Sequence, residues 1–152
     1  MKAPIVVVPL ALLALAACSR SPLVGTWVSD HDLTAESIRR DSDPEHKLDE
    51  AAVERLVGPT ATVTFTASEA VFDLPPGSLP TDNPAAVHET YAYSVGALDA
   101  QHEDITLAGP APGASRPLHV HFEGRDLLWI DNEVGNTDLP IHSFRQYFRR
   151  AH

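Results

Sequence analysis

From residue 60 onward, short runs with a two-residue hydrophobic period alternate with segments rich in proline and glycine. In Thr60–Thr66, for example, threonines alternate with Ala61, Val63 and Phe65. Successive side chains of a β-strand point to opposite faces, so this period is typical of strands with one buried face. We therefore predict a mainly β fold. The segments that we expect to be strands are 23–29, 60–66, 70–74, 87–95, 104–108, 118–122, 127–131 and 141–149.

A hydrophobic core must stabilise this fold, because Cys18 is the only cysteine in the chain and no internal disulfide can form. A chain of this length can bury roughly two thirds of its surface in one core. Every proline from Pro22 onward falls outside the eight expected strands, where a missing N–H does no harm. About eight short antiparallel strands suit an up-and-down barrel, which leaves no sheet edge unpaired. We expect residues 23–152 to form a single β-barrel domain.

A helical insertion, over about residues 34–57, is expected between the first two strands. Thr34 is placed to cap a short helical turn, and Asp43 followed by Pro44 is typical of the start of a second helix. Gly58 is typical of its end. We expect the helices to pack on a core, with a lid over the barrel opening as the alternative. The apolar stripe of the second helix consists of Leu48, Ala52 and Leu56.

The N-terminus has the layout of an export signal. Lys2 precedes about ten apolar residues from Ile5 to Ala14. This run is too short for a transmembrane helix, which needs roughly 20 residues. The next four residues, Leu15-Ala16-Ala17-Cys18, resemble the lipobox of bacterial lipoproteins, where the cysteine is lipidated and the chain is cut before it. An ordinary secretory signal cleaved after an Ala-x-Ala sequence is the alternative.

The lipoprotein resemblance has consequences for location. It implies that residues 1–17 are a signal peptide, that Cys18 becomes an N-terminus bearing palmitate and other acyl chains, and that residues 18–22 form a tether. The membrane is then a partner through this lipid. Ser19, rather than an aspartate, follows the cysteine. This resembles the default sorting of Gram-negative lipoproteins, so we expect the cell envelope, at the outer membrane facing the periplasm.

The charge of the chain excludes one class of partner. Its formal net charge is −10, and removal of residues 1–17 would take away Lys2 and no acidic side chain. A strongly acidic domain repels the phosphate backbone, so we expect no nucleic-acid partner. The same charge disfavours electrostatic attraction to anionic membrane surfaces.

The two ends of the expected domain resemble the calycin barrels, which are the lipocalins and fatty-acid-binding proteins. Gly25 and Trp27 match the Gly-x-Trp of the first strand, and the resemblance implies that an arginine from the last strand, Arg145 or Arg149, packs on Trp27. Arg145 and Tyr147 are similar to the Arg-x-Tyr pair that grips a ligand carboxylate in the fatty-acid-binding branch.

Tyr91 and Tyr93 lie two apart on one expected strand, so both rings share one face. We take them, together with Arg145 and Tyr147, as candidate ligand-binding residues. The resemblance implies a barrel that holds a small apolar or amphiphilic ligand.

His119 and His121 are candidate metal ligands, because side chains two apart on a strand point to the same side. His142 or Asp131 could complete such a site. However, Leu118 and its even-numbered neighbours form a good core face, which places both histidines on the opposite face. We therefore expect an exposed pair without a metal, and no cofactor.

No nucleophile motif such as Gly-x-Ser-x-Gly is present, so we expect no enzymatic activity. The favoured hypothesis is a membrane-tethered periplasmic lipoprotein that binds a small ligand in a lipocalin-like barrel. The first alternative is a structural or interaction lipoprotein whose barrel is filled by its own side chains. The second alternative is a metal-binding protein that uses His119 and His121.

Overall fold

The computed structural model describes residues 21–45, 47–76, 85–99, 101–108, 115–134 and 139–152. Within these ranges the fold is mainly β, with eight strands and a helical insertion after the first strand, as predicted. The strands are β1 (Gly25–Ser29), β2 (Thr62–Phe65), β3 (Glu69–Leu74), β4 (Val87–Leu98), β5 (His102–Ala108), β6 (Ser115–Phe122), β7 (Leu127–Glu133) and β8 (Ser143–Arg150).

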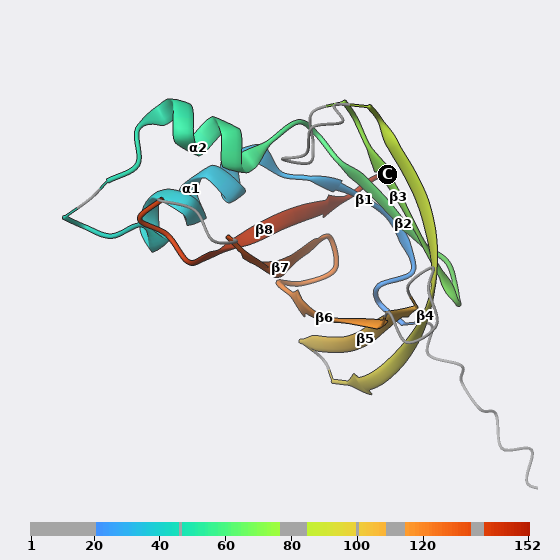
Figure 1. The fold of residues 1–152 in the computed structure, drawn as a ribbon. Helices are drawn as coiled ribbons and strands as arrows, with labels where there is room; N and C mark the ends of the chain where they lie inside the picture. The colour runs from blue at the N-terminus through green and yellow to red at the C-terminus, as the bar shows by residue number, and fades with distance from the viewer. Residues whose placement is uncertain (1–20, 46, 77–84, 100, 109–114, 135–138) are drawn as a thin grey trace, which may run out of the picture.

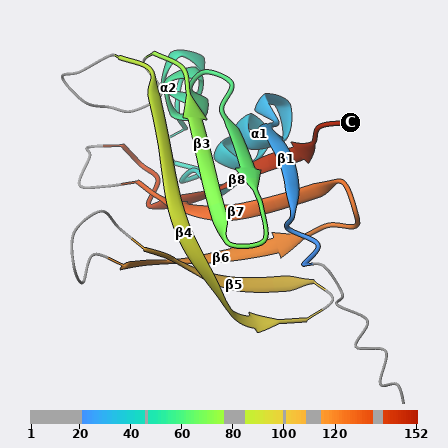
Figure 2. The ribbon, with the colours of Figure 1, turned by 90° about the vertical axis from the view of Figure 1, so that its right-hand side faces the viewer.

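The strands form a closed antiparallel barrel in sequence order, and β8 pairs back with β1 (Figures 1 and 2). This confirms the predicted up-and-down topology, and it is compatible with a calycin-like fold. The closing seam is short, since three residue pairs, from Trp27–Arg150 to Ser29–Phe148, join β1 to β8. The first and last strands are therefore neighbours although they lie at opposite ends of the sequence.

The two ends of the barrel carry different connections. The chain enters where β1 begins, and the short turns from β2 to β3, β4 to β5 and β6 to β7 lie at the same end (Figure 2). We call this the sealed end, for the contacts described below. The opposite end, where β1 leads into the helices and where β3, β5 and β7 finish, is called the distal end.

Side chains that alternate along the strands fill the barrel. On β5, for example, Ile105 and Leu107 are buried while Thr106 between them is exposed. Phe65 and Tyr93 meet edge to face, with ring centroids 5.7 Å apart. The buried cluster consists of Leu23, Trp27, Val63, Phe65, Ala70, Tyr93, Ile105, Leu107, Val120, Phe122, Leu128 and Phe148.

The strands differ from their predicted ranges by one to three residues at their ends, and the largest differences are in β4 and β6. β4 continues to Leu98, and β6 begins at Ser115, so that Pro117 lies inside a strand. The N–H of Phe122 donates toward β5, to the carbonyl oxygen of Gln101 at 2.7 Å. By alternation, the missing N–H of Pro117 faces β7. Pairing with β7 covers only the end of β6 near Phe122, so the proline costs no ladder bond.

The helices are α1 (His31–Asp41) and α2 (Glu50–Val57), and both begin at other residues than predicted. Asp30 caps α1 by accepting the N–H of Leu33, and Asp49 caps α2 by accepting that of Ala52. Neither Thr34 nor Asp43 is an N-cap. Asp43 instead accepts the N–H of the second residue beyond it and forms a local turn.

Helix α1 covers the part of β8 that β1 does not reach. Oγ1 of Thr34 accepts the N–H of Tyr147 at 3.1 Å, and Oγ of Ser37 accepts that of Arg145 at 3.0 Å. The N–H of Asp30 donates to the carbonyl oxygen of Tyr147 at 2.8 Å. Both hydroxyl-bearing residues are buried. The helix therefore takes the place of a neighbouring strand and satisfies donors that would otherwise be orphaned.

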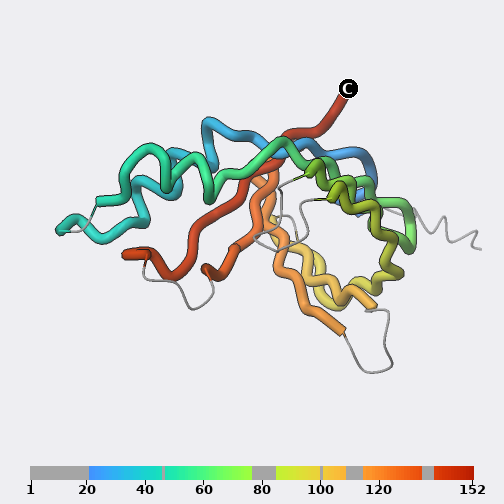
Figure 3. Tube along the Cα trace, turned by 45° about the horizontal axis from the view of Figure 1, so that its top comes forward, coloured from blue at the N-terminus to red at the C-terminus, as the bar shows by residue number. Residues whose placement is uncertain are grey.

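The helices lie beside the barrel (Figure 3). They pack on a second core there, which agrees with the expectation that they cover a core. Within the described ranges, neither helix is long and apolar enough to cross a membrane. The second core consists of Ala35, Ile38, Val53, Val57, Ile141 and Phe144, with Leu48, Leu56, Val134 and Leu139 packed against it.

Candidate functional site

Trp27 closes the barrel at the sealed end. Its side chain is 0 % exposed, and its ring centroid lies 6.5 Å from that of Phe122. The indole Nε1 donates to the carbonyl oxygen of Leu23 at 2.7 Å. The guanidinium carbon of Arg150 lies 4.3 Å from the indole centroid, which is cation–π geometry. The predicted packing of an arginine from the last strand on Trp27 is therefore present.

The arginine concerned is Arg150, and the prediction of Arg145 or Arg149 is wrong. The register places Arg150 directly opposite Trp27, whereas Arg149 is the neighbour on the other face of β8 and pairs with Asp30. Arg145 lies on the same outer face of β8 as Arg149, nearer the distal end. A shift of one residue along a strand changes the face, so a short motif could not decide between adjacent arginines.

Arg150 also binds the backbone of the entering chain. Its Nη1 donates to the carbonyl oxygen of Val24 at 2.9 Å, and its Nη2 donates to that of Pro22 at 2.5 Å. Gly25, which the sequence assigns to barrel closure, lies beside this guanidinium. The backbone angle φ of Gly25 is 143°, a value that residues with a side chain rarely adopt. An added Cβ would also collide with the Arg150 guanidinium.

Glu103 is a buried carboxylate at the sealed end that the sequence analysis did not single out. Its side chain is fully buried, and both carboxylate oxygens accept from Oγ of Ser21, at 2.6 and 2.5 Å. The backbone N–H of Leu23 also donates to it. Burial raises the pKa of Glu103, while these hydrogen bonds act in the opposite direction. Glu103 lies two residues before the hydrophobic Ile105 on the same strand, so the alternation of side chains predicts that it faces inward.

On four strands, the burial of the inward-facing side chains decreases from the middle of the barrel toward the distal end. We name four of them the distal ring. They pack against the barrel core but are only partly buried, and they are Phe72, Tyr91, Leu118 and Ile130. On the same strands, the inward residue one step nearer the sealed end is buried in each case. These inner neighbours are Ala70, Tyr93, Val120 and Leu128.

Two of the predicted ligand-binding residues face into the barrel. Tyr93 is buried, and its hydroxyl donates to the carbonyl oxygen of Thr66 at 2.7 Å. Tyr91 belongs to the distal ring, and its hydroxyl donates to the carboxylate of Glu89. That hydrogen bond raises the pKa of Tyr91, and the positive charge of Arg116 acts against this rise. Glu89 thus lies at the hydroxyl of Tyr91, and Arg116 is close enough for its charge to act on that hydroxyl.

The other two predicted ligand-binding residues do not lie in the barrel. Phe148 belongs to the barrel core, so its odd-numbered neighbours on β8 face outward. The guanidinium of Arg145 lies over the outer ring of Trp129, 4.3 Å from its centroid. Tyr147 is buried beneath α1, where Arg40 bonds to it. The structure therefore does not bring this pair together with Tyr91 and Tyr93, and an Arg-x-Tyr grip inside the barrel is excluded.

Sequence reasoning missed the polar side chains near the distal ring, although the two-residue period places them. Arg116 lies two residues before Leu118 and opposite the buried Leu107, so it belongs to the inward series of β6. Across β7 and β8, Nδ2 of Asn132 donates to Oε1 of Gln146 at 2.5 Å. An apolar ring surrounded by a few polar groups is typical of sites for amphiphilic molecules.

His119 and His121 lie on the outer face of β6, as expected. Nδ1 of His119 lies 2.7 Å from a carboxylate oxygen of Asp104. The ring of His121 stacks on Trp129 with centroids 3.8 Å apart and meets His102 edge to face. Burial, with a smaller contribution from His102, lowers the pKa of His121.

Among the described residues, no group of three or more His, Cys, Asp or Glu side chains is placed to hold a metal ion. His142 and Asp131, the further ligands considered, do not complete such a group with the histidine pair. Asp131 lies across the β7–β8 ladder from Arg145. The geometry gives no support to a metal centre on this face.

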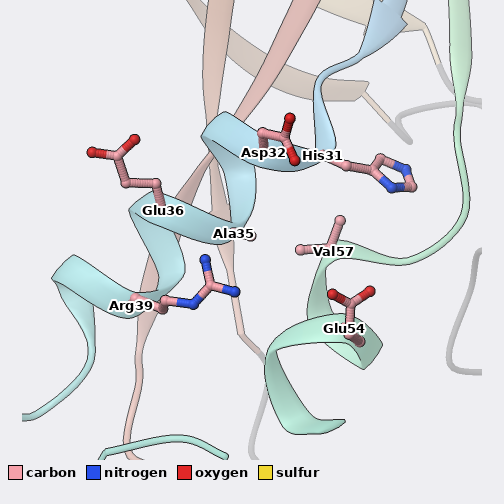
Figure 4. Close-up of a pocket in the computed structure, with 7 residues that line it drawn as sticks. All are labelled: His31, Asp32, Ala35, Glu36, Arg39, Glu54 and Val57. Atoms are coloured by element: carbon pink, nitrogen blue, oxygen red, sulfur yellow. The ribbon is translucent and has the colours of Figure 1, made fainter. Parts of the chain in front are cut away.

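Two hollows lie outside the barrel, next to the helices. The first has a volume of about 440 Å³ and lies between α1 and α2, where His31 and Arg39 of α1 face Glu54 of α2 (Figure 4). The second, of about 640 Å³, lies where the end of α1 approaches β7 and β8. It is lined by Asp41, Asp43, Asp131, Pro140, Ile141, His142, Ser143, Phe144 and Arg145.

Cys18 and the signal segment 1–17 lie outside the described residues, so lipidation stays a prediction from the sequence. Of the expected tether, the structure describes Ser21 and Pro22, and both are bonded to the sealed end. Comparisons with protein-family models, with curated proteins and with solved structures find no match to this chain.

Proposed function

We propose that this protein is a membrane-tethered periplasmic lipoprotein whose barrel binds a small apolar or amphiphilic ligand at its distal end. The observation that carries this proposal is the change in burial along four strands. On β3, β4, β6 and β7 the inner neighbours Ala70, Tyr93, Val120 and Leu128 are buried, whereas the residues of the distal ring stay partly exposed. Partly exposed apolar side chains that face inward gain from a ligand that removes them from water.

The distribution of charge supports an amphiphile. Glu89 belongs to the inward series of β4 and Arg116 to that of β6, and both act on Tyr91, so they are placed to meet a polar head group while the distal ring contacts an apolar tail. This assignment replaces Arg145 and Tyr147, which face outward. The ligand would bind close to the distal opening, because Trp27, Phe122 and their neighbours fill the barrel between the distal ring and the sealed end.

A ligand-binding experiment tests this proposal with two adjacent residues of β6. Leu118 faces inward in the distal ring, and His119 faces outward. We expect Leu118→Gln to weaken the binding of a dansyl-labelled fatty acid by about tenfold, since a buried apolar contact of this size is worth more than 1 kcal/mol. His119→Gln should bind as the wild type does. Urea titration shows whether both variants are folded. Equal affinities in two folded variants would contradict the proposed site.

The main alternative is a structural or interaction lipoprotein with a filled barrel, and the packing of the sealed half favours it. Twelve buried residues fill the described barrel core. In that case the wild-type protein would not bind the labelled fatty acid at all. The same titration therefore decides between the two functions.

The membrane location is tested separately. Cys18→Ala should release the processed protein from the membrane fraction without unfolding the barrel, because no disulfide is lost. Fractionation and a urea titration measure both properties. A Cys18→Ala protein that stays in the membrane fraction after signal cleavage would refute lipid anchoring.

A further inference from the structure

The sealed end carries an exposed apolar run close to the entry of the chain. In Val95–Leu98, at the end of β4, all four residues are exposed and none is charged. Val95 is 44 % exposed and Leu98 is 46 % exposed. Among the described residues, these two are the large hydrophobic side chains that are exposed. The ladder to β5 shifts its register between these two residues. Such a bulge locally bends the strand.

The register places this run beside the entering chain. Leu98 lies directly opposite Glu103 on β5, and opposite residues of paired strands have Cα atoms about 5 Å apart. Glu103 is also the residue that holds Ser21 through both carboxylate oxygens. Figures 1 and 2 both show the end of β4 and the start of β1 at the same end of the barrel.

The chain between this anchor point and Cys18 is short. Cys18 lies three positions before Ser21, and an extended chain spans at most about 3.6 Å per residue, so the cysteine lies within about 11 Å of Ser21. A lipid on Cys18 would therefore hold the sealed end, with its apolar run, against the surface of the bilayer. Hydrogen bonds from Arg150 to the backbone of Pro22 and Val24 prevent the entry segment from lengthening this reach.

We propose that Val95–Leu98 is a membrane-contact segment that rests in the head-group region of the bilayer to which Cys18 is attached. This inference rests on the lipid anchoring proposed above. Apolar side chains gain free energy when they leave water for the interface, and they add to the attachment that acyl chains provide. Asp99, Glu123 and Asp126 lie in the turns at the same end and outnumber Arg125 beside them, so anionic lipids would be disfavoured there. The segment therefore fits a zwitterionic surface.

The contact orients the barrel. With the sealed end on the bilayer, the distal ring faces away from it, toward the aqueous compartment. Glu133, at the distal end of β7, is exposed and provides a control position far from the membrane.

A quenching experiment on the full-length protein tests this orientation. Leu98→Trp and Glu133→Trp place a fluorescent reporter at the two ends, and the parent protein, with Trp27 and Trp129, gives the baseline. Each protein is produced in a lipidating bacterium and reconstituted into phosphatidylcholine vesicles with or without a doxyl-labelled phospholipid. We expect the doxyl lipid to cause a loss of fluorescence from position 98 and no loss from position 133.

The outcomes separate the two proposals. Vesicle-bound, lipidated Leu98→Trp protein that is quenched no more than Glu133→Trp would overturn the membrane contact while leaving the anchor intact. Mass spectrometry of the peptide that contains Cys18 measures lipidation independently. A peptide without acyl chains would overturn both the anchoring and the contact that rests on it.

Discussion

The seal formed by Trp27 gives the sharpest stability prediction. The ring is fully buried, donates a hydrogen bond to Leu23 and lies under the guanidinium of Arg150. Removal of a buried tryptophan costs about 3–5 kcal/mol. The lost hydrogen bond is worth about 1 kcal/mol and the lost cation–π contact about 0.5–1 kcal/mol, which places Trp27→Ala near the upper part of that range. A domain stable by about 5–15 kcal/mol would come close to unfolding.

Trp129 is the matched control, because it is the other tryptophan of the chain and lies on the outer face of the barrel, partly exposed. Its ring contacts His121 and Arg145 but fills no interior. Trp129→Ala should cost about 1–2 kcal/mol, within the range of ordinary substitutions. Each variant keeps a single tryptophan, so its emission also reports the surroundings of the remaining ring.

Urea titrations compare the two variants. With a slope of about 2 kcal/mol per molar urea, Trp27→Ala should lower the unfolding midpoint by roughly 2 M and Trp129→Ala by less than about 1 M. The tryptophan left in Trp129→Ala should emit at shorter wavelength than the one left in Trp27→Ala. Equal midpoint shifts, or equal emission, would refute the barrel closure derived from Trp27.

Further predictions concern the seal, the helix and the buried acid. Arg150→Ala should cost about 2–3 kcal/mol because it leaves three backbone carbonyls and the Trp27 ring without their contact to the guanidinium, whereas Arg149→Ala removes an ion pair whose guanidinium is largely exposed and should cost less than about 1 kcal/mol in urea titrations. Ser37→Ala, which orphans a β8 N–H, should cost about 1–3 kcal/mol, and the exposed Ser94→Ala of β4 less than about 0.5 kcal/mol, by thermal unfolding. The raised pKa of Glu103 means that the folded state favours the protonated carboxyl. Urea midpoints of the wild type should therefore fall relative to those of Glu103→Gln as the pH rises from below 4.5, the ordinary pKa of a glutamate carboxyl, through the higher pKa of Glu103 in the folded state, and a constant difference would contradict this.

The strands and their order could be predicted because the period of two is a local signal. Thr62, Val63 and their neighbours alternate as expected, and the closed barrel follows from eight such runs in hairpin order. The predicted first residues of the two helices are wrong, because several aspartates in this segment could each serve as the N-cap. Asp30 and Asp49 cap the helices, whereas Asp43 forms a local turn. Which cap is used depends on where the helix packs, and that is tertiary information.

The candidate site was predicted only in part, for reasons of register. Tyr91 and Tyr93 share the inner face as the alternation requires. Arg145 and Tyr147 also share a face, but it is the outer one, and only the position of Phe148 in the core settles this. Glu103 was passed over because a charged residue breaks the hydrophobic pattern of its strand, although its neighbours fix its direction.

The proposed protein has a lipid-bearing N-terminus at one end of the barrel and a ligand at the other. Native mass spectrometry of the full-length protein, extracted from the membranes of a lipidating bacterium, measures both at once. We predict a chain that begins at acylated Cys18 and carries a bound amphiphile, which is lost in Leu118→Gln and retained in His119→Gln. An acylated chain without any bound molecule would contradict the binding function, and a chain without acyl groups would contradict the anchor.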